Sequence, residues 1–248
     1  MIKKINFLDI PLDTISMDET INKIEEAIFL EKQIHHCVIN ASKVVKMQND
    51  QMLKESVLNC DIISADGMSI VWATRFLGHN IYERVAGIDL MEELIKLSHK
   101  KKYKCFFFGA KENVVKKLVT DFSKKYSRDL IAGYRSGYYN LNEESLIVEE
   151  IKKSNANILF VAMSTPKKEI FLNKYKKELS RINLIMGVGG SFDVISGETK
   201  RAPKFLQSIG LEWFYRLIQE PKRMWRRYLI GNISFLILIL KAKFISKL

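Results

Sequence analysis

Short apolar runs of strand length alternate with stretches of helical periodicity along most of this chain of 248 residues. We expect strands at residues 36–40, 61–65, 104–108, 130–133, 158–163 and 184–188. Helices are expected between them, at residues 18–30, 68–77, 88–100, 112–125, 143–153 and 167–179, with Asp18 as the N-cap of the first. Alternating strands and helices form βαβ units. The sequence therefore predicts an α/β fold, a Rossmann-like and mainly parallel sheet with helices on both faces.

The chain shows no repeat and no linker rich in glycine and serine. We expect an α/β core over residues 1–200, with a soft division near residue 101, and a basic amphipathic helical appendage over residues 201–248. Pro221 suits the first turn of a helix, whereas Glu220 before it is pushed out of helical geometry. The appendage should therefore contain one helix at about 203–219 and a second at 221–244.

The appendage carries most of the positive charge of the chain. Residues 200–248 hold eleven lysines and arginines against two glutamates, a net charge of +9 out of +12 for the whole sequence. The apolar run at residues 229–240 lies among them, but it is shorter than the roughly 20 residues that cross a bilayer. A short apolar helix beside arginines is typical of a segment that lies on an anionic membrane surface.

Two features indicate where the protein works. The N-terminus begins like a secretory signal, but Asp9 and Pro11 interrupt its apolar region. Cys37, Cys60 and Cys105 are odd in number and lack CxxC spacing, so we expect free buried thiols in a reducing compartment. The sequence thus predicts a cytoplasmic protein, peripheral on the inner face of the cell membrane.

Ligands of an open parallel sheet bind at the carboxyl ends of its strands, which here lead into five loops, at residues 39–41, 65–68, 108–110, 163–166 and 187–193. Asp66 has two interpretations: a general base in the cleft, or, favoured by periodicity alone, the N-cap of the helix at 68–77. The glycines of 187–193 permit close approach of a phosphate, but they lack the GxGxxG spacing of dinucleotide sites. His35 and His36 point to opposite faces of a strand, and no cluster has metal-ligand spacing.

The loops taken together resemble the WecG/TagA/CpsF family of glycosyltransferases. The resemblance rests on ordered pieces across nearly the whole chain: Ile39-Asn40-Ala41, Ala65-Asp66-Gly67, residues 83–90 (ERVAGIDL), Phe108-Gly109, residues 133–138 (GYRSGY), Thr165-Pro166-Lys167, residues 187–193 (GVGGSFD), Arg201-Ala202-Pro203 and residues 210–217 (GLEWFYRL). Each piece alone is weak, whereas the ordered set is highly specific.

This resemblance implies an inverting hexosyltransferase that needs neither a metal ion nor a cofactor. The expected donor is a UDP-sugar carrying N-acetylmannosamine, its uronic acid or a related hexose. The expected acceptor is N-acetylglucosamine linked through diphosphate to undecaprenol, in teichoic acid or surface polysaccharide synthesis. It also implies that the appendage meets the membrane and helps to complete the active site.

The resemblance assigns roles to individual residues. Asp66 matches the catalytic base, and Arg84 matches a functional arginine on the phosphates, against an ordinary ion pair with Glu83 or Asp89 as the alternative. Asn40 orients the sugar or is a turn residue. The UDP-sugar site is expected from Gly109, Gly187, Gly189, Asp193 (on the uracil or ribose, or as a helix cap) and Tyr138 (stacked on the base, or in the core).

Arginines of the appendage are the expected cations for the departing UDP. We expect some of them to bind the phosphates and the others to contact lipid headgroups, among Arg216, Arg223 and Arg227. The alternative is that they form a solvated basic face. Pro221 interrupts the first interval, so only Arg223 and Arg227 are expected on one helical face.

Three positions depart from the family pattern. Lys168 stands at a glutamine near the donor sugar, Ser164 at a glycine, and Val38 where a threonine is frequent. An ammonium cannot reproduce the paired donor and acceptor of an amide. Lys168 therefore suggests a changed donor preference, toward an acidic sugar that it can pair with.

Two other classes of function remain at this point. The chain can be a catalytically degenerate, membrane-peripheral protein that binds UDP-sugars or acts as a scaffold, which Val38 and Lys168 favour. It can also be a nucleic-acid binder, which its charge alone supports. Nucleic acid offers nothing to bury the apolar run at 229–240, so we expect no nucleic-acid partner. The helices of the appendage also suit a homo-oligomer, which the sequence does not specify.

Overall fold

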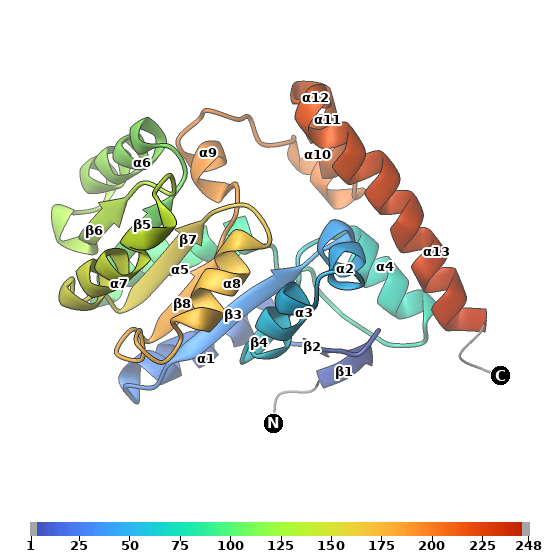
Figure 1. The fold of residues 1–248 in the computed structure, drawn as a ribbon, viewed down its shortest axis with the longest axis horizontal. Helices are drawn as coiled ribbons and strands as arrows, with labels where there is room; N and C mark the ends of the chain where they lie inside the picture. The colour runs from blue at the N-terminus through green and yellow to red at the C-terminus, as the bar shows by residue number, and fades with distance from the viewer. Residues whose placement is uncertain (1–3, 245–248) are drawn as a thin grey trace.

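The computed structural model describes residues 4–244, except for the side chain of Arg223. Within that range, six parallel strands form one sheet in the order β4-β3-β8-β7-β5-β6 (Figure 1). The strands are β3 (Ile34–Ile39), β4 (Ile62–Ala65), β5 (Cys105–Gly109), β6 (Ile131–Arg135), β7 (Ile158–Ala162) and β8 (Leu184–Gly187). The predicted α/β fold with a parallel sheet is confirmed, and each strand end lies within two residues of its expected position.

Helices cover both faces of this sheet. One face is packed by α1 (Met17–Phe29), α5 (Gly87–Lys101), α6 (Glu112–Lys125) and α9 (Ser191–Ile195). The other is packed by α2 (Ala41–Met47), α3 (Gln51–Leu58), α7 (Glu144–Lys153) and α8 (Lys167–Lys174), while α4 (Met68–Phe76) follows β4. Short 3₁₀ turns at Arg128–Leu130 and Leu141–Glu143 precede β6 and α7.

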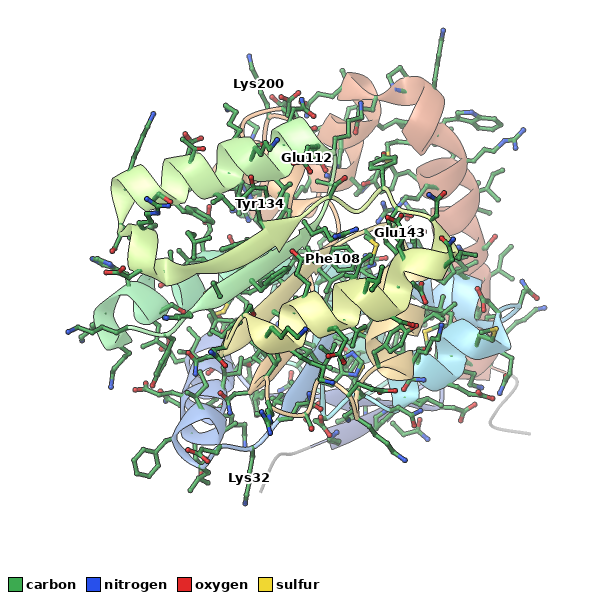
Figure 2. All side chains as sticks on the ribbon, turned by 60° about the vertical axis from the view of Figure 1, so that its left-hand side comes forward. Lys32, Phe108, Glu112, Tyr134, Glu143 and Lys200 are labelled. Carbon is green, nitrogen blue, oxygen red and sulfur yellow. The ribbon has the colours of Figure 1, made fainter. Side chains whose placement is uncertain are left out.

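The side chains of β5 show how the apolar runs build two cores. Phe107 belongs to the cluster under α5 and α6, whereas Phe106 and Phe108 belong to the cluster under α7 and α8. Successive strand residues point to opposite faces, so a run of apolar residues is required when both faces are covered. In Figure 2, Phe108 lies in the interior, while Lys32 and Lys200 project outward at opposite ends of the molecule.

The first 16 residues contain structure that the sequence analysis did not predict. Strands β1 (Lys4–Phe7) and β2 (Ile10–Asp13) form an antiparallel hairpin, with Leu8 and Asp9 at positive φ in its turn. The carboxylate of Asp13 accepts a hydrogen bond of 2.8 Å from the backbone N–H of Ile63 in β4. From Lys4 onward, the segment that resembles a signal sequence is thus part of the folded core.

The N-cap expected for α1 was wrong by two residues. Ser16 is the N-cap, and it forms a capping box with Glu19, in which each side chain accepts from the backbone N–H of the other residue. This pattern of serine followed three residues later by glutamate satisfies two free N–H groups at once. Asp18 instead lies in the first turn, where its charge favours the helix dipole.

The appendage is more broken than the sequence suggested. The helix expected at 203–219 is two helices, α10 (Lys204–Ser208) and α11 (Glu212–Gln219), because Gly210 between them adopts a φ of +71°. The expected break before Pro221 is confirmed. Beyond it, α12 (Pro221–Trp225), a π-helical turn (Arg226–Ile230) and α13 (Gly231–Phe244) continue one another.

Helix α13 is apolar on both sides, so the prediction of an amphipathic helix was wrong for this part of the appendage. Gly231, Phe235 and Ile239 are buried, and the last two belong to the core cluster around β3 and β4. The opposite side exposes Ile233, Leu236, Ile237 and Leu240. Over the described residues, no helix has both the length and the hydrophobicity that crossing a membrane requires.

The cysteines and the paired histidines are buried. Cys37, Cys60 and Cys105 are free thiols, as expected. His35 pairs with Ile185 and His36 with Met186 in the register of β3 and β8, so the two rings face the two different cores. Burial lowers the pKa of His35 to about 4 and that of His36 to about 3.

These histidines predict loss of stability in acid. Their folded pKa values lie below the unfolded value of about 6.5, so the unfolded chain binds more protons as pH falls below 6.5. We expect the free energy of unfolding to fall by about 1.4 kcal/mol per pH unit for each histidine between about pH 6 and 4. Urea titrations across this range should show a shallower pH dependence for His36→Gln than for the wild type. The control is His99→Gln at an exposed position, and equal slopes in all three proteins would contradict the prediction.

Candidate active site

The predicted site residues lie in a row along one edge of the sheet. Following the strand order, the loops at the carboxyl ends present Asp66, Asn40, the glycines of 187–190, Lys168 and Gly109, and then Tyr138 beyond β6. Five strand spacings of about 4.8 Å separate the first loop from the last, or about 24 Å. A ligand that touches both ends must therefore be elongated.

Asp66 lies at the β4 end of the row and does not cap the helix that follows it. The N-cap of α4 is Gly67, with no side-chain hydrogen bond. Instead, Oδ1 of Asp66 accepts a hydrogen bond of 3.1 Å from the backbone N–H of Gly87, the first residue of α5. Oδ2 has no hydrogen-bond partner among the residues described. The carboxylate is half-buried and held at one oxygen, which leaves the other oxygen for a ligand.

Asn40 is next to Asp66 and has a structural role. A Cβ on Gly67 would lie 3.9 Å from the Cβ of Asn40, and the backbone N–H of Asp66 donates to the carbonyl of Ile39. The side-chain oxygen of Asn40 accepts from the backbone N–H of Lys43 at 3.0 Å, so Asn40 is the N-cap of α2. This cap uses the amide oxygen of Asn40. The amide NH₂ is not used by the cap and can donate a hydrogen bond to a sugar hydroxyl.

Arg84 connects the core to the appendage. Its guanidinium lies 3.1 Å from Glu212 in α11 and 3.6 Å from Asp89 in α5. Asp89 in turn pairs with Arg201 at 2.6 Å, so four charges of alternating sign form a chain. Of the two partners considered for Arg84, Asp89 is present, whereas Glu83 accepts from the backbone of Met17. Glu212 was not anticipated, because it is 128 residues away in the sequence.

Lys168 is buried within an ion cluster that the sequence did not reveal. The ammonium groups of Lys168 and Lys43 each lie 2.7 Å from the same oxygen of Glu169. Lys168 also donates to the hydroxyl of Thr165 at 2.6 Å, and Lys43 donates to the carbonyl of Val38 at 2.6 Å. Two buried cations around one carboxylate leave a net charge of +1 beside the cleft.

The pKa values of the three residues in this cluster are shifted in different directions. Burial, together with the charge of Lys43, lowers the pKa of Lys168 to about 8. The pKa of Glu169 is held well below its usual range by both lysines, although burial alone would raise it. The pKa of Lys43 is raised, because its neighbours Cys37 and Glu169 outweigh the cost of burial. Lys168 is thus the cation of the cluster whose charge is most readily lost.

The glycine turn after β8 lies against Lys168 on one side and Arg216 on the other. A Cβ on Gly187 would lie 3.1 Å from Cδ of Lys168, and one on Gly189 would lie 4.0 Å from its Cε. A Cβ on Gly190 would lie 2.6 Å from Nη2 of Arg216, so a side chain at this position would require the end of Arg216 to move. The structure therefore brings the predicted arginine of α11 to the predicted glycine loop. Asp193 is half-buried within α9, next to this turn.

Gly109 and Tyr138 lie together at the β5–β6 end. Gly109 adopts a φ of +136°, and a Cβ there would lie 2.3 Å from the carbonyl oxygen of Ala162. The backbone N–H of Gly137 donates to the carbonyl of Ala110, which places the Tyr138 loop on the Gly109 turn. Tyr138 is 74% exposed, so its alternative role in the core was wrong.

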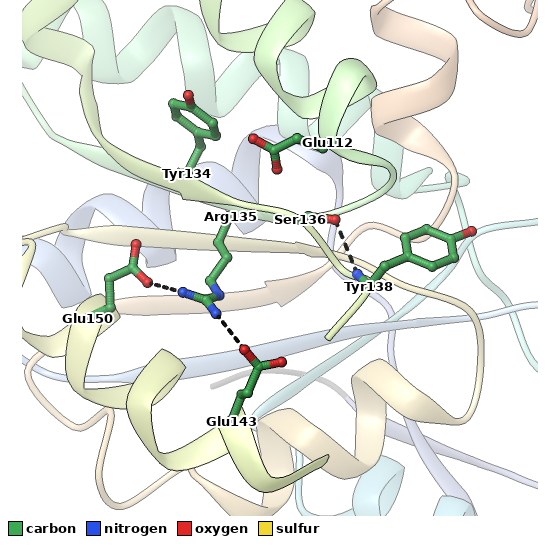
Figure 3. Close-up of a pocket in the computed structure, with 7 residues that line it drawn as sticks. All are labelled: Glu112, Tyr134, Arg135, Ser136, Tyr138, Glu143 and Glu150. Atoms are coloured by element: carbon green, nitrogen blue, oxygen red, sulfur yellow. Dashed lines mark hydrogen bonds and ion pairs between the residues drawn. The ribbon is translucent and has the colours of Figure 1, made fainter. Parts of the chain in front are cut away.

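A depression of about 370 Å³ lies beside Tyr138 (Figure 3). Arg135 crosses it and is bound by Glu150 at 2.9 Å and Glu143 at 3.5 Å. The remaining lining comes from Glu112, Tyr134 and Ser136. Carboxylates repel phosphates but accept hydrogen bonds from ribose hydroxyls or a base N–H, so this end suits a nucleoside better than a diphosphate.

Of the other two arginines predicted for the site, the structure describes the side chain of Arg227 alone. Arg227 does not join Arg216 at the glycine turn; it is exposed and lines a groove between α2 and α13. The side chain of Arg223 lies outside the described residues. The shared face expected for Arg223 and Arg227 therefore stays a prediction.

Comparison with known proteins gives this arrangement a context. A model of the glycosyl transferase WecG/TagA/CpsF family matches residues 5–248. The chain belongs to this family of glycosyltransferases. It is 38% identical over 169 residues to the N-acetylglucosaminyldiphosphoundecaprenol N-acetyl-beta-D-mannosaminyltransferase of Bacillus subtilis strain 168, an alignment that covers 68% of this chain and 64% of that relative. It is 34% identical over 208 residues to the protein of the same name from Bacillus spizizenii strain W23, covering 82% and 79% of the two chains.

The structure places two further residues at the candidate site of this WecG/TagA/CpsF member. Glu169 neutralises Lys168, and Lys43 completes the cluster from α2. Glu169 follows Lys168 directly in the Thr165-Pro166 motif, so its place near the cleft was available from the sequence. Lys43 carried no such signal, because a lysine in the first turn of a helix is ordinarily solvated.

The cluster predicts a large effect of a conservative substitution. Glu169→Gln leaves two ammonium groups buried without a carboxylate, and we expect the free energy of unfolding to fall by about 3–5 kcal/mol. Urea denaturation measures this change. The control, Glu178→Gln at an exposed position, should stay within about 0.5 kcal/mol of the wild type. Equal stability of the two variants would mean that the cluster does not stabilise the fold.

Proposed function

We propose that the chain is an inverting transferase that moves a sugar from a UDP donor to N-acetylglucosamine linked through diphosphate to undecaprenol, in teichoic acid or surface polysaccharide synthesis. The transferred sugar is N-acetylmannosamine, its uronic acid or a related hexose. The names of the two Bacillus relatives support the acceptor and the mannosaminyl group. The single observation that carries the proposal is the half-buried Asp66, held at one oxygen beside Asn40 and two strands from the glycine turn.

In this mechanism Asp66 is the general base. Its Oδ2 takes the proton of an acceptor hydroxyl while that oxygen attacks the anomeric carbon of the donor sugar. The new C–O bond forms on one face as the bond to the β-phosphate of UDP breaks on the other, so the anomeric configuration inverts. The hydrogen bond from Gly87 orients the carboxylate without taking up both oxygens.

Cations are available for the negative charge of the departing UDP. Arg216 lies at Gly190 of the glycine turn, Lys168 lies beneath Gly187, and Arg84 pairs with Glu212 of α11, the helix that carries Arg216. Positioned cations stabilise a developing charge without reorganisation at the moment of reaction. The depression beside Tyr138 at the other end of the row then suits the uridine.

The appendage supports a peripheral membrane location on the cytoplasmic face. Exposed apolar side chains follow one another along the π-helical turn and α13: Leu229, Ile230, Ile233, Leu236, Ile237, Leu240 and Phe244. Basic residues lie at both ends of this apolar surface along the chain, Arg226 and Arg227 at its start and Lys241 and Lys243 near its end. An apolar strip between cations is suited to the headgroup region of an anionic bilayer. A homo-oligomer that buries part of this strip stays a prediction.

Because Asp66 is the proposed general base, replacing it should lower the transferase activity. Asp66→Asn keeps the hydrogen bond to Gly87 through its amide oxygen but cannot accept the proton, so acceptor-dependent release of UDP should fall by about 10²–10⁴-fold. The assay uses UDP-N-acetylmannosamine with a soluble-tailed lipid-diphosphate N-acetylglucosamine. Asp121→Asn, an exposed substitution on α6, is the matched control. Undiminished release by Asp66→Asn would remove Asp66 from the reaction, and UDP binding without turnover by the wild type would favour a degenerate binding protein.

The position and the charge of Lys168 lead to a prediction about the preferred donor and the pH dependence of that preference. An ammonium beneath Gly187 favours a carboxylated sugar, and this charge is lost as pH rises through the pKa of about 8. The ratio of kcat/KM for uronic and neutral UDP-sugars should therefore fall between about pH 7 and 9, and Lys168→Gln should lower the ratio at pH 7 and flatten the profile. A ratio that neither the substitution nor the pH changes would show that Lys168 does not select the donor.

A further inference from the structure

A groove with a cationic and an apolar lining lies between α2 and the C-terminal helices. Figure 1 shows α13 running beside α2, and the groove between them has a volume of about 610 Å³. One wall is formed by Ser42, Val45, Lys46, Asn49, Asp50, Gln51 and Met52, and the other by Arg226, Arg227, Ile230, Gly231 and Ser234. A Cβ on Gly231 would lie 3.9 Å from Cβ of Ser42, so the two helices meet closely at one point of the groove.

The cations of the groove are not neutralised by the protein. Lys46 donates to the carbonyl oxygen of Thr165 at 3.1 Å, which leaves its charge unpaired. Among the described residues, no carboxylate lies within 4 Å of Arg226 or Arg227, which only stack on the adjacent rings of Trp225 and Tyr228. The one acidic residue, Asp50, accepts from the backbone N–H of Leu53 as the N-cap of α3. The groove therefore suits a ligand with phosphate groups.

The apolar part of the groove leads onto the exposed face of α13. Met52 is 61% exposed and Ile230 is 53% exposed, a high accessibility for such side chains in a folded protein. Ile230, Ile233 and Ile237 are three and four residues apart, so they lie on one side of the helix. A chain that leaves the groove along Ile230 thus continues over the strip assigned to the membrane.

The other end of the groove adjoins the proposed active site. Ser42 is two residues beyond Asn40, and Lys46 contacts the Thr165 loop, whose hydroxyl accepts from Lys168. The groove therefore starts beside the residues proposed to hold the reacting sugars and ends at the membrane-facing strip.

We propose that this groove binds the polyprenyl diphosphate of the acceptor, with the phosphates on Lys46, Arg226 and Arg227 and the first isoprene units over Val45, Met52 and Ile230. The inference rests on the proposed function and adds to it the path of the lipid. It predicts that the protein recognises the tail of the acceptor as well as its sugar.

The test compares two acceptors that differ in their tails. Ser234→Trp fills the groove, and we expect it to raise KM at least about tenfold for an undecaprenyl-diphosphate acceptor in detergent micelles and less than about twofold for one with a short alkyl tail. The double variant Lys46→Glu/Arg227→Glu should raise KM for both acceptors, because both carry the diphosphate. Leu146→Trp and Lys124→Glu, exposed positions on α7 and α6, are the controls for bulk and for charge.

The outcomes separate the groove from the reaction. A wild type that turns over both acceptors, with Ser234→Trp affecting neither or both equally, would overturn the groove and leave the transferase intact. If the double variant Lys46→Glu/Arg227→Glu loses binding to anionic phospholipid vesicles but keeps the wild-type KM in micelles, the groove is a phospholipid site. That result would also overturn the proposal that the groove binds the acceptor. If the wild type turns over neither acceptor, photo-crosslinking with a diazirine-bearing polyprenyl diphosphate still decides: label within residues 42–52 or 226–234 supports the groove, and label elsewhere overturns it.

Discussion

Six parallel strands impose one direction on the whole molecule, because all of their carboxyl ends must meet at the same edge of the sheet. Residues that are separated by more than a hundred positions in the sequence are therefore brought into a single row, from Asp66 to Tyr138. The strand order decides where each lies: β8 enters between β3 and β7, so the glycine turn stands in the middle of the row. Lys43, Lys168 and Arg216 give the middle of the row its positive charge, whereas carboxylates line the β6 end. An elongated ligand with a nucleoside at one end and a phosphate-linked sugar at the other matches this gradient.

The appendage packs into the core and contacts residues of the candidate site. Phe235 and Ile239 complete the cluster around β3 and β4, Glu212 binds Arg84, and Arg216 occupies the space over Gly190. The same helices expose an apolar strip with arginines at one end and lysines at the other. In the proposed function, a soluble donor reaches the carboxyl edge of the sheet, and a lipid-linked acceptor arrives along α13. The two would meet where Glu212 contacts Arg84 and Arg216 contacts the glycine turn. In the proposed function, membrane docking and assembly of the active site therefore depend on the same set of helices.

Local patterns in the sequence were sufficient for the sheet and for the loops at its carboxyl edge, and they failed where distant residues decide. Apolar runs bounded by polar residues located the strands, since burial on both faces leaves a clear signal. Asp66 was favoured as a helix cap by periodicity, but its partner is Gly87, 21 residues away. Lys43 became a buried cation because of Glu169, which no local rule could pair with it. The apolar run at 229–240 was assigned to the membrane alone, whereas tertiary packing buries one of its sides.

A crystal structure of the Asp66→Asn variant with a UDP-sugar donor and a short-tailed acceptor tests the central claim most directly. The account predicts that the anomeric carbon lies within about 3.5 Å of an acceptor hydroxyl, which is itself within hydrogen-bond reach of residue 66. The diphosphate should lie at the turn of Gly187–Gly190 near Arg216, and the uridine toward Gly109 and Tyr138. A donor bound with its sugar at the β6 end, or away from the carboxyl edge of the sheet, would contradict it.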